Sequence, residues 1–308
     1  MQTEQITQIV AAAKRYMEQH QLSQNQLATA STINEAYVSV MLSGGTKVGN
    51  TVIADMHWEK LAAAVNLKLE EEVWPLLKTR QFDKLLAELK LSKRDRVSKT
   101  ILGEKGSGKT ITIEFFKEES PKHTYVITIN HLMKLPDILS RLQHILGLPT
   151  VGSSYQRLFD IIMKLRDIQL KGGQPILIFD EAENMAPSTM QMIKGLFDGI
   201  HRYCAIILVG TSQFEDKLRV AAAKNKQAAP QFVSRFFANL QRLPDVDRKY
   251  AGFFATHNVP ADLKRYLAEH CNDYRELNLM LEPVIKECAE HGTELTFEAF
   301  KIYHNIAA

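Results

Sequence analysis

Residues 103–110 constrain the fold more than any other part of the chain. They read Gly-Glu-Lys-Gly-Ser-Gly-Lys-Thr and match the phosphate-loop pattern G-x-x-x-x-G-K-[ST] at every fixed position. The glycines allow a tight turn in which successive backbone N–H groups point at phosphate oxygens. The flanking residues predict a strand at 97–102 and a helix at 111–116, whose start adds a positive dipole end. An ordinary strand-to-helix turn is the alternative, but this context favours nucleotide binding.

The loop residues have distinct expected roles. Lys109 is expected to reach the β- and γ-phosphates of ATP, and the Thr110 hydroxyl is expected to bind Mg²⁺. The implied cofactors are therefore ATP and Mg²⁺. The other residues expected to bind the nucleotide are Gly103, Glu104, Lys105, Gly106, Ser107 and Gly108.

An acidic strand supplies the second half of the expected site. Residues 175–181 read Pro-Ile-Leu-Ile-Phe-Asp-Glu, and their continuous apolar run is typical of a strand buried on both faces of a parallel sheet. Two carboxylates are costly to bury unpaired, so they belong at the carboxyl edge of the sheet, where ligands bind. We expect Asp180 to hold Mg²⁺ directly or through water, and Glu181 to orient and polarise the attacking water. A helix cap is the alternative interpretation of the two acids.

Two further strands complete the predicted α/β pattern. Residues 205–212 form an apolar run that ends in Gly-Thr-Ser, and residues 124–130 form another good strand. Thr211, or with less support Ser212, could position the water or report the nucleotide state, although such a sequence is usually only a turn. Strands alternating with helices predict an α/β fold with a parallel sheet flanked by helices.

Composition excludes several classes of protein. Of the 308 residues, 45% are hydrophobic and 24% are charged, which is ordinary for a globular protein. No apolar run approaches the roughly 20 residues of a membrane helix, so no membrane partner is expected. The start of the chain lacks a signal-peptide pattern, and its 3 cysteines lack metal-ligand spacing, which favours the cytoplasm. The net charge of +3 neither indicates nor excludes nucleic-acid binding.

The first part of the chain, residues 1–72, is predicted to be a separate all-α domain. The spacing of Leu22-Ser23, Gln26-Leu27-Ala28, Ile33, Val38-Ser39, Leu42 and Gly44 resembles the helix-turn-helix of phage-repressor DNA-binding domains. The expected recognition helix at 34–41 contains no Lys or Arg, and Glu35 would oppose phosphates. A helical module for protein contacts or weak nonspecific DNA contact is therefore an equal alternative. Residues 73–96 follow as a basic helical connector, whose charges could be a solvated face or could meet phosphates.

The residues after the last core strand suggest assembly. Arg235 lies in the aromatic segment 231–237, where oligomeric ATPases carry an arginine that reaches the γ-phosphate of a neighbouring subunit. It could instead only stack on aromatic rings. Arg275 begins a later helix and could reach the nucleotide from a lid, or could be a plain surface residue. We expect an ATPase core at 97–243 and a C-terminal helical lid at 244–308.

These features together resemble the AAA+ ATPases, the family that combines a phosphate loop, an acidic strand, a polar sensor residue, an arginine finger and a helical lid. Within it, the chain is most similar to transposition protein B of phage Mu and its relatives. The shared features are the repressor-like domain before the ATPase, the Asp-Glu-Ala strand end, the Leu-Val-Gly-Thr strand end, the Ser-Arg-Phe-Phe segment and the short lid. The chain departs from the usual lid motif at Asn272, where a Gly often precedes the sensor arginine.

The resemblance implies an ATPase that binds double-stranded DNA nonspecifically, forms a helical homo-oligomeric filament, and delivers target DNA to a cognate transposase that it activates. Candidate DNA contacts are Lys134, Arg157 and Lys164, each of which could also be a solvated surface charge. Two alternatives remain. One is an ATPase of the same superfamily that loads a helicase or initiates replication, and the other is a DNA-binding regulator that does not hydrolyse ATP.

Overall fold

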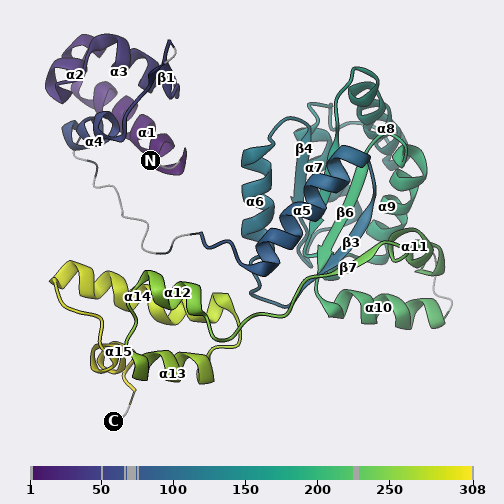
Figure 1. Cartoon of the computed structure of the whole chain (residues 1–308). Coiled ribbons are helices and arrows are strands. Elements are labelled where there is room, and N and C mark those ends of the chain that lie inside the picture. The colour runs from purple at the N-terminus through teal and green to yellow at the C-terminus, as the bar shows by residue number, and fades with distance from the viewer. Residues whose placement is uncertain are drawn as a thin grey trace. The chain divides into compact units, whose positions relative to one another are not determined.

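The computed structural model describes residues 3–49, 51–65, 67, 74, 76–224 and 229–306. The chain divides into two compact units, Met1–Val73 and Trp74–Ala308. Figure 1 traces both units along the chain. The boundary predicted between residues 72 and 73 falls outside the described residues.

Unit 1 is almost entirely helical. Its second helix begins with a capping box, in which Ser23 accepts from the Gln26 backbone and the Gln26 side chain accepts from the Ser23 backbone. The side chain of Asn34 caps the third helix in the same region. The helices enclose a small core that includes Leu27, Val38 and Trp58. The elements are α1 (Thr3–His20), α2 (Gln24–Ser31), α3 (Glu35–Leu42), the antiparallel strands β1 (Lys47–Val48) and β2 (Thr51–Val52), and α4 (Asp55–Ala64).

Unit 2 contains a five-stranded parallel sheet. The strands are ordered β4-β5-β6-β3-β7. In the register of the sheet, Thr128 is opposite Asp180 and Leu102 is opposite Gly210, so the carboxyl ends of four strands meet at one edge. The strands are β3 (Lys99–Leu102), β4 (Thr124–Thr128), β5 (Ile176–Asp180), β6 (Ala205–Gly210) and β7 (Leu240–Arg242).

Helices cover both faces of this sheet (Figure 1). Leu177 and Phe179 pack in one core with α7, α8 and α9, whereas Ile176 and Ile178 pack in another with α5 and α6. The alternation follows because successive side chains of a strand point to opposite faces. It also explains why β5 has an unbroken apolar sequence. The helices are α5 (Arg80–Asp95), α6 (Lys109–Glu119), α7 (Leu135–Ile145), α8 (Ser154–Leu170), η1 (Ala182–Asn184), α9 (Pro187–Ile200), α10 (Ser212–Ala223) and α11 (Ala229–Phe236).

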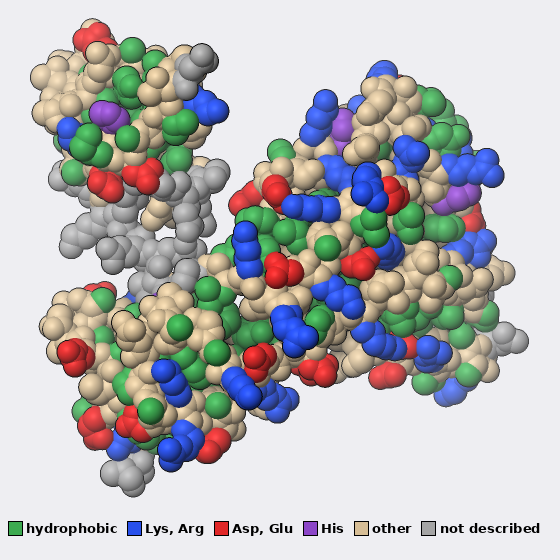
Figure 2. Space-filling view, viewed as in Figure 1, with side chains coloured by type: hydrophobic (Ala, Val, Ile, Leu, Met, Phe, Trp, Pro, Cys, Tyr) green, Lys and Arg blue, Asp and Glu red, His purple; other side chains and the backbone are tan. Residues whose placement is uncertain are grey.

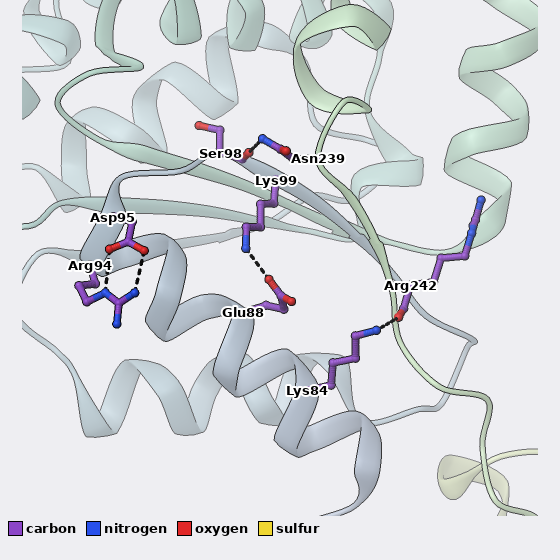
Figure 3. Close-up of polar contacts among 8 residues, drawn as sticks. All are labelled: Lys84, Glu88, Arg94, Asp95, Ser98, Lys99, Asn239 and Arg242. Atoms are coloured by element: carbon purple, nitrogen blue, oxygen red, sulfur yellow. Dashed lines mark hydrogen bonds and ion pairs between the residues drawn. The ribbon is translucent and has the colours of Figure 1, made fainter.

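The segment predicted as a connector contains a helix that packs against the sheet of unit 2. Thr79 caps α5 by accepting from the backbone of Phe82, and the buried side chains of Phe82, Leu85 and Leu89 form an apolar stripe at helical spacing. This stripe packs against α6 and the sheet, while basic residues occupy the other side. Figure 3 shows this polar side, where Lys84 donates to the carbonyl of Arg242 on β7. The helix is therefore a structural layer of unit 2.

The C-terminal helices enclose a core of their own, which includes Phe254, Leu267, Leu281 and Phe300. Gln81 at the start of α5 joins them to the sheet domain: its amide donates to the carbonyl of Asp245 and accepts from the Tyr274 hydroxyl. Among the described helices, none combines the length and apolar character that a bilayer span requires. The elements are α12 (Ala251–Thr256), α13 (Ala261–His270), α14 (Tyr274–His291) and α15 (Phe297–His304).

Candidate nucleotide-binding site

The phosphate loop connects β3 to α6, as the sequence predicts. Gly106 and Gly108 have φ angles of +61° and +83°, a region that other residues rarely adopt. Gly108 is also the N-cap of α6, so the loop opens onto the N-terminus of a helix. Backbone N–H groups at a helix N-terminus attract anions. This geometry suits a bound phosphate.

Lys109 lies across the loop. Its ammonium donates to the carbonyls of Gly103 at 3.1 Å and Glu104 at 2.6 Å. Burial lowers the pKa of Lys109, and the negative charges of Glu183 and Asp180 oppose that effect. The ammonium thus sits between the loop and the acidic strand, where it can meet a polyphosphate.

The two predicted Mg²⁺ ligands are in direct contact. The Thr110 hydroxyl donates to Asp180 Oδ2 at 2.7 Å, and the Glu181 backbone N–H donates to Asp180 Oδ1 at 2.9 Å. Asp180 is 1% exposed, and burial raises the pKa of its carboxyl. A hydroxyl and a carboxylate are hard oxygen donors of the kind Mg²⁺ selects. These residues therefore fit the ion that the loop sequence implies.

Glu181 is positioned by a residue that the sequence analysis missed. Its backbone is left-handed, with φ of +53°, and its Oε2 accepts from Asn184 Nδ2 at 3.1 Å. The same amide nitrogen donates to the carbonyl of Ile129, just beyond β4. Asn184 thus joins the exposed carboxylate to the neighbouring strand. The only sequence signal was a carboxamide three residues after the acid.

Two buried oxygens at this edge have no hydrogen-bond partner among the described residues: Thr211 Oγ1 and Glu183 Oε2. Glu183 Oε2 lies 2.8 Å from the point where a Cβ on Gly210 would stand, so Glu183 meets the end of β6 here. Unsatisfied buried polar atoms are costly, and they commonly face a ligand or water. Glu183 was missed because a third acid after Asp-Glu looks like ordinary helix sequence.

The lid touches the loop. A Cβ on Gly106 would collide with the carboxylate of Asp273, which caps α14 by accepting from the Glu276 backbone at 2.9 Å. Arg275 is close enough for its charge to contribute to lowering the pKa of Lys109. The structure therefore brings the predicted lid arginine near the loop, although its role stays a prediction.

Arg235 does not lie in the site of its own chain. On α11, its Nε donates to Asp198 Oδ1 on α9 at 2.6 Å, and its Nη1 donates to the carbonyl of Gln231. A role toward a neighbouring subunit stays a prediction, and it requires the pair with Asp198 to open.

The DNA-contact candidates differ in exposure. Lys134 is exposed at the start of α7, and Lys164 is half-buried on α8. Arg157 is only 8% exposed, and its guanidinium donates to Gln143 Oε1 at 2.7 Å and Ser140 Oγ at 2.6 Å. These bonds hold α8 to α7 and would have to open for Arg157 to reach DNA, so its DNA contact stays a prediction.

Comparisons with known proteins agree with this geometry. Residues 93–218 match the family model described as AAA domain. No curated protein matched the sequence. The ORC1 protein of Aeropyrum pernix, solved in complex with DNA, is similar with a TM-score of 0.55 and 14% identity, over 77% of this chain and 68% of that one.

Two further solved structures are similar. One is the ORC2 protein of Aeropyrum pernix in ADPNP–ADP complexes, with a TM-score of 0.52 and 15% identity, over 76% of this chain and 69% of that one. The other is CDC6P of Pyrobaculum aerophilum, with a TM-score of 0.52 and 16% identity, over 74% and 66%. Together with the matched domain, these likenesses confirm the predicted fold class: unit 2 has the AAA+ fold.

Proposed function

We propose that this protein hydrolyses ATP, assembles in its ATP-bound form as a helical filament on double-stranded DNA, and delivers that DNA to a transposase in the cytoplasm. The observation that carries the proposal is the meeting of Lys109, Thr110, Asp180 and Glu181 at one edge of the sheet. A phosphate loop and two acids with separate environments are the parts that ATP hydrolysis requires.

The proposed chemistry gives Asp180 and Glu181 different roles, because their environments differ. Asp180 is buried beside the Thr110 hydroxyl, so the pair is suited to hold Mg²⁺, which when bound neutralises charge on the phosphates. Glu181 is exposed and held by Asn184, which suits it to accept a proton from the attacking water. Thr211 Oγ1 is a candidate to orient that water.

The proposed assembly places each nucleotide at a seam between two copies. Arg235 of one copy would leave Asp198 and stabilise the γ-phosphate bound by the next copy. Binding of ATP then strengthens the filament, and hydrolysis weakens it, because the charge that holds Arg235 is lost. Nucleotide turnover would therefore control release of the DNA.

DNA binding is supported by two indirect observations. A protein of similar fold, the Aeropyrum pernix ORC1 protein, was solved in complex with DNA. In unit 1, α2 and α3 lie in the order and spacing of a helix-turn-helix, and Ser23 and Asn34 cap them. The transposase as partner rests on the order of domains and on the sequence resemblance.

A second candidate function is that of a replication initiator or helicase loader. It is favoured by the likeness to ORC1, ORC2 and CDC6P structures, which at 14–16% identity extends to the fold alone. Such an ATPase would not form long filaments on random duplex DNA or stimulate a transposase. A regulator that binds ATP without hydrolysing it is the third possibility.

Electron microscopy with random duplex DNA, in ATP and in ADP, tests the proposal. We expect filaments with ATP, none with Lys109→Ala because ATP binding is lost, and normal filaments with the matched control Lys117→Ala, which removes an exposed lysine from the last turn of α6. Glu181→Gln should bind ATP and assemble but turn it over at least about 100-fold more slowly, since a general base contributes that much. ATP-dependent filaments formed by Lys109→Ala would refute the proposal, and a wild type that binds but never hydrolyses ATP would favour the regulator.

A further inference from the structure

A basic pocket lies at the opposite edge of the ATPase sheet from the phosphate loop. It has a volume of about 610 Å³ and is lined by the C-terminal ends of α5 and α6, the loop 120–123 and the residues 172–174. The strands β4 and β5 begin here, at Thr124 and Ile176, whereas the phosphate loop follows the carboxyl end of β3. The pocket is thus separate from the candidate nucleotide site.

Cations dominate the lining. Lys90, Lys93 and Arg94 come from α5 and Lys122 from the facing loop, against a single lining carboxylate, Glu119. Lys90 pairs with Glu119 at 2.8 Å, and Arg94 pairs with its neighbour Asp95 (Figure 3). In the described part of the chain, neither Lys93 nor Lys122 has an acidic partner. The pocket therefore keeps an excess of positive charge.

Lys93 places one of these cations in a buried position. The side chain is 8% exposed, and its ammonium donates to the carbonyl of Lys122 at 2.7 Å, to Ser120 Oγ at 2.7 Å and to Thr124 Oγ1 at 2.8 Å. These neutral acceptors hold the loop 120–124 against α5 but do not cancel the charge. A buried charge without a counterion is unfavourable, so an anion in the pocket would be stabilised.

The pKa of His123 is also affected by the cations of this pocket. Burial lowers the pKa of His123, and the charges of Lys122 and Lys93 lower it further. Figure 2, viewed as in Figure 1, shows Lys and Arg side chains interspersed with acids over the part of unit 2 where α5 lies. Cations on two facing walls of an open groove suit a polyanion, because its phosphates can accept from both sides.

We propose that this pocket binds a phosphate of the DNA backbone, as a contact site on the face of the ATPase away from the nucleotide. Lys90 and Lys122 would donate to the phosphate oxygens from opposite walls, with Lys93 as the fixed charge beneath them. Contacts of this kind position DNA without reading its sequence. The inference rests on the proposed DNA-binding function and names where part of that binding occurs.

The test uses the full-length protein with ATP and a random duplex, with affinity measured by fluorescence anisotropy over a range of salt. The double variant Lys90→Gln/Lys122→Gln should lose about tenfold in affinity, and the slope of log K against log salt should fall by about one, because both lysines contact the same phosphate and each lost phosphate contact removes about one unit. ATP binding should be unchanged, since both residues lie far from the phosphate loop. The matched control is Arg265→Gln, an exposed cation of α13.

Each outcome decides one question. If the wild type with ATP does not bind DNA, the proposed function fails. If the wild type binds but the double variant has the same affinity and salt slope, or if Arg265→Gln loses as much, only the pocket assignment fails.

The titration of His123, followed by NMR, separates the possible ligands. Bound duplex should raise the pKa of His123, because phosphate charge offsets that of Lys122 and Lys93. An equal rise with inorganic phosphate, at the same phosphate concentration and ionic strength, would assign the pocket to small anions and overturn the proposal. Competition by polyglutamate as strong as that by DNA would also overturn it.

Discussion

At the scale of one residue, the buried carboxylate of Asp180 lowers the stability of the folded protein at neutral pH. Desolvation raises the pKa of Asp180, and bonds from the Thr110 hydroxyl and the Glu181 backbone only partly offset it. The charged form is therefore disfavoured in the folded protein. A cation beside it would reverse that penalty.

Replacing Asp180 should stabilise the nucleotide-free protein. In Asp180→Asn the amide can keep both hydrogen bonds, because the Thr110 hydroxyl can donate or accept. We expect the free energy of unfolding to rise by about 1 kcal/mol at pH 7, the scale found when a destabilised functional site is relaxed. Urea unfolding without nucleotide measures it.

The pH dependence of this effect has a definite sign. Asp180 has a pKa above its ordinary value of 3.8 in the folded state, so the folded protein binds more protons than the unfolded chain between the two values. Stability of the wild type should therefore fall as pH rises through that window. The advantage of Asp180→Asn should grow over the same range and vanish below it. An advantage that is constant down to pH 3, or a less stable variant, would contradict this account.

Among the elements, α5 shows how tertiary packing defines the role of an amphipathic helix. Its many basic residues predict a connector, and its apolar residues at 82, 85 and 89 recur at helical spacing. Tertiary structure decides, because α6 and the sheet present a surface that this stripe covers. The basic side then lies beside the N-terminal edge of the sheet and contributes to a pocket.

Two identical substitutions in α5 test its structural role. Leu85 is fully buried, whereas Leu91 is 38% exposed. We expect Leu85→Ala to lower the free energy of unfolding by about 3 kcal/mol, through lost burial and a cavity, and Leu91→Ala to lower it by less than about 1 kcal/mol. Urea unfolding followed by circular dichroism compares them. Similar small effects of both would mean that α5 is a solvated connector after all.

At the scale of the whole molecule, the ion pair between Arg235 and Asp198 is a contact within the single chain that the proposed assembly would replace. Within one chain the guanidinium is held on α9, with Nε 2.6 Å from Asp198 Oδ1. Because both side chains are partly exposed, the pair contributes at most about 1 kcal/mol. A γ-phosphate across a seam is a stronger partner, so assembly could open the pair at little cost.

A mixing experiment tests the arrangement across the seam. Arg235→Ala alone should bind ATP but lose about 10³-fold in DNA-stimulated turnover, the effect typical of an arginine finger. Glu181→Gln alone should also be inactive. A mixture should regain turnover, because Glu181→Gln copies supply Arg235 to the intact sites of Arg235→Ala copies. Asp198→Asn is the control, since it removes the pair but keeps Arg235, and it should remain active. A mixture as inactive as its parts would exclude a shared site.

The sequence by itself determined the local chemistry of this protein. The phosphate loop and the acidic strand end follow from residues adjacent in the chain, whose backbone preferences and periodicity need little help from the rest of the fold. The parallel α/β class also followed, because an unbroken apolar strand between helices has few other solutions.

Only the tertiary structure decided which distant residues meet. Arg157 looked like a surface cation until α7 supplied the acceptors that bury it. Glu183 and Asn184 became site residues because β6 and β4 lie beside β5, and Asp273 reaches the loop only because the lid folds back to it. The physical reason is the same in each case: burial and hydrogen bonding depend on neighbours in space, which spacing along the chain does not encode.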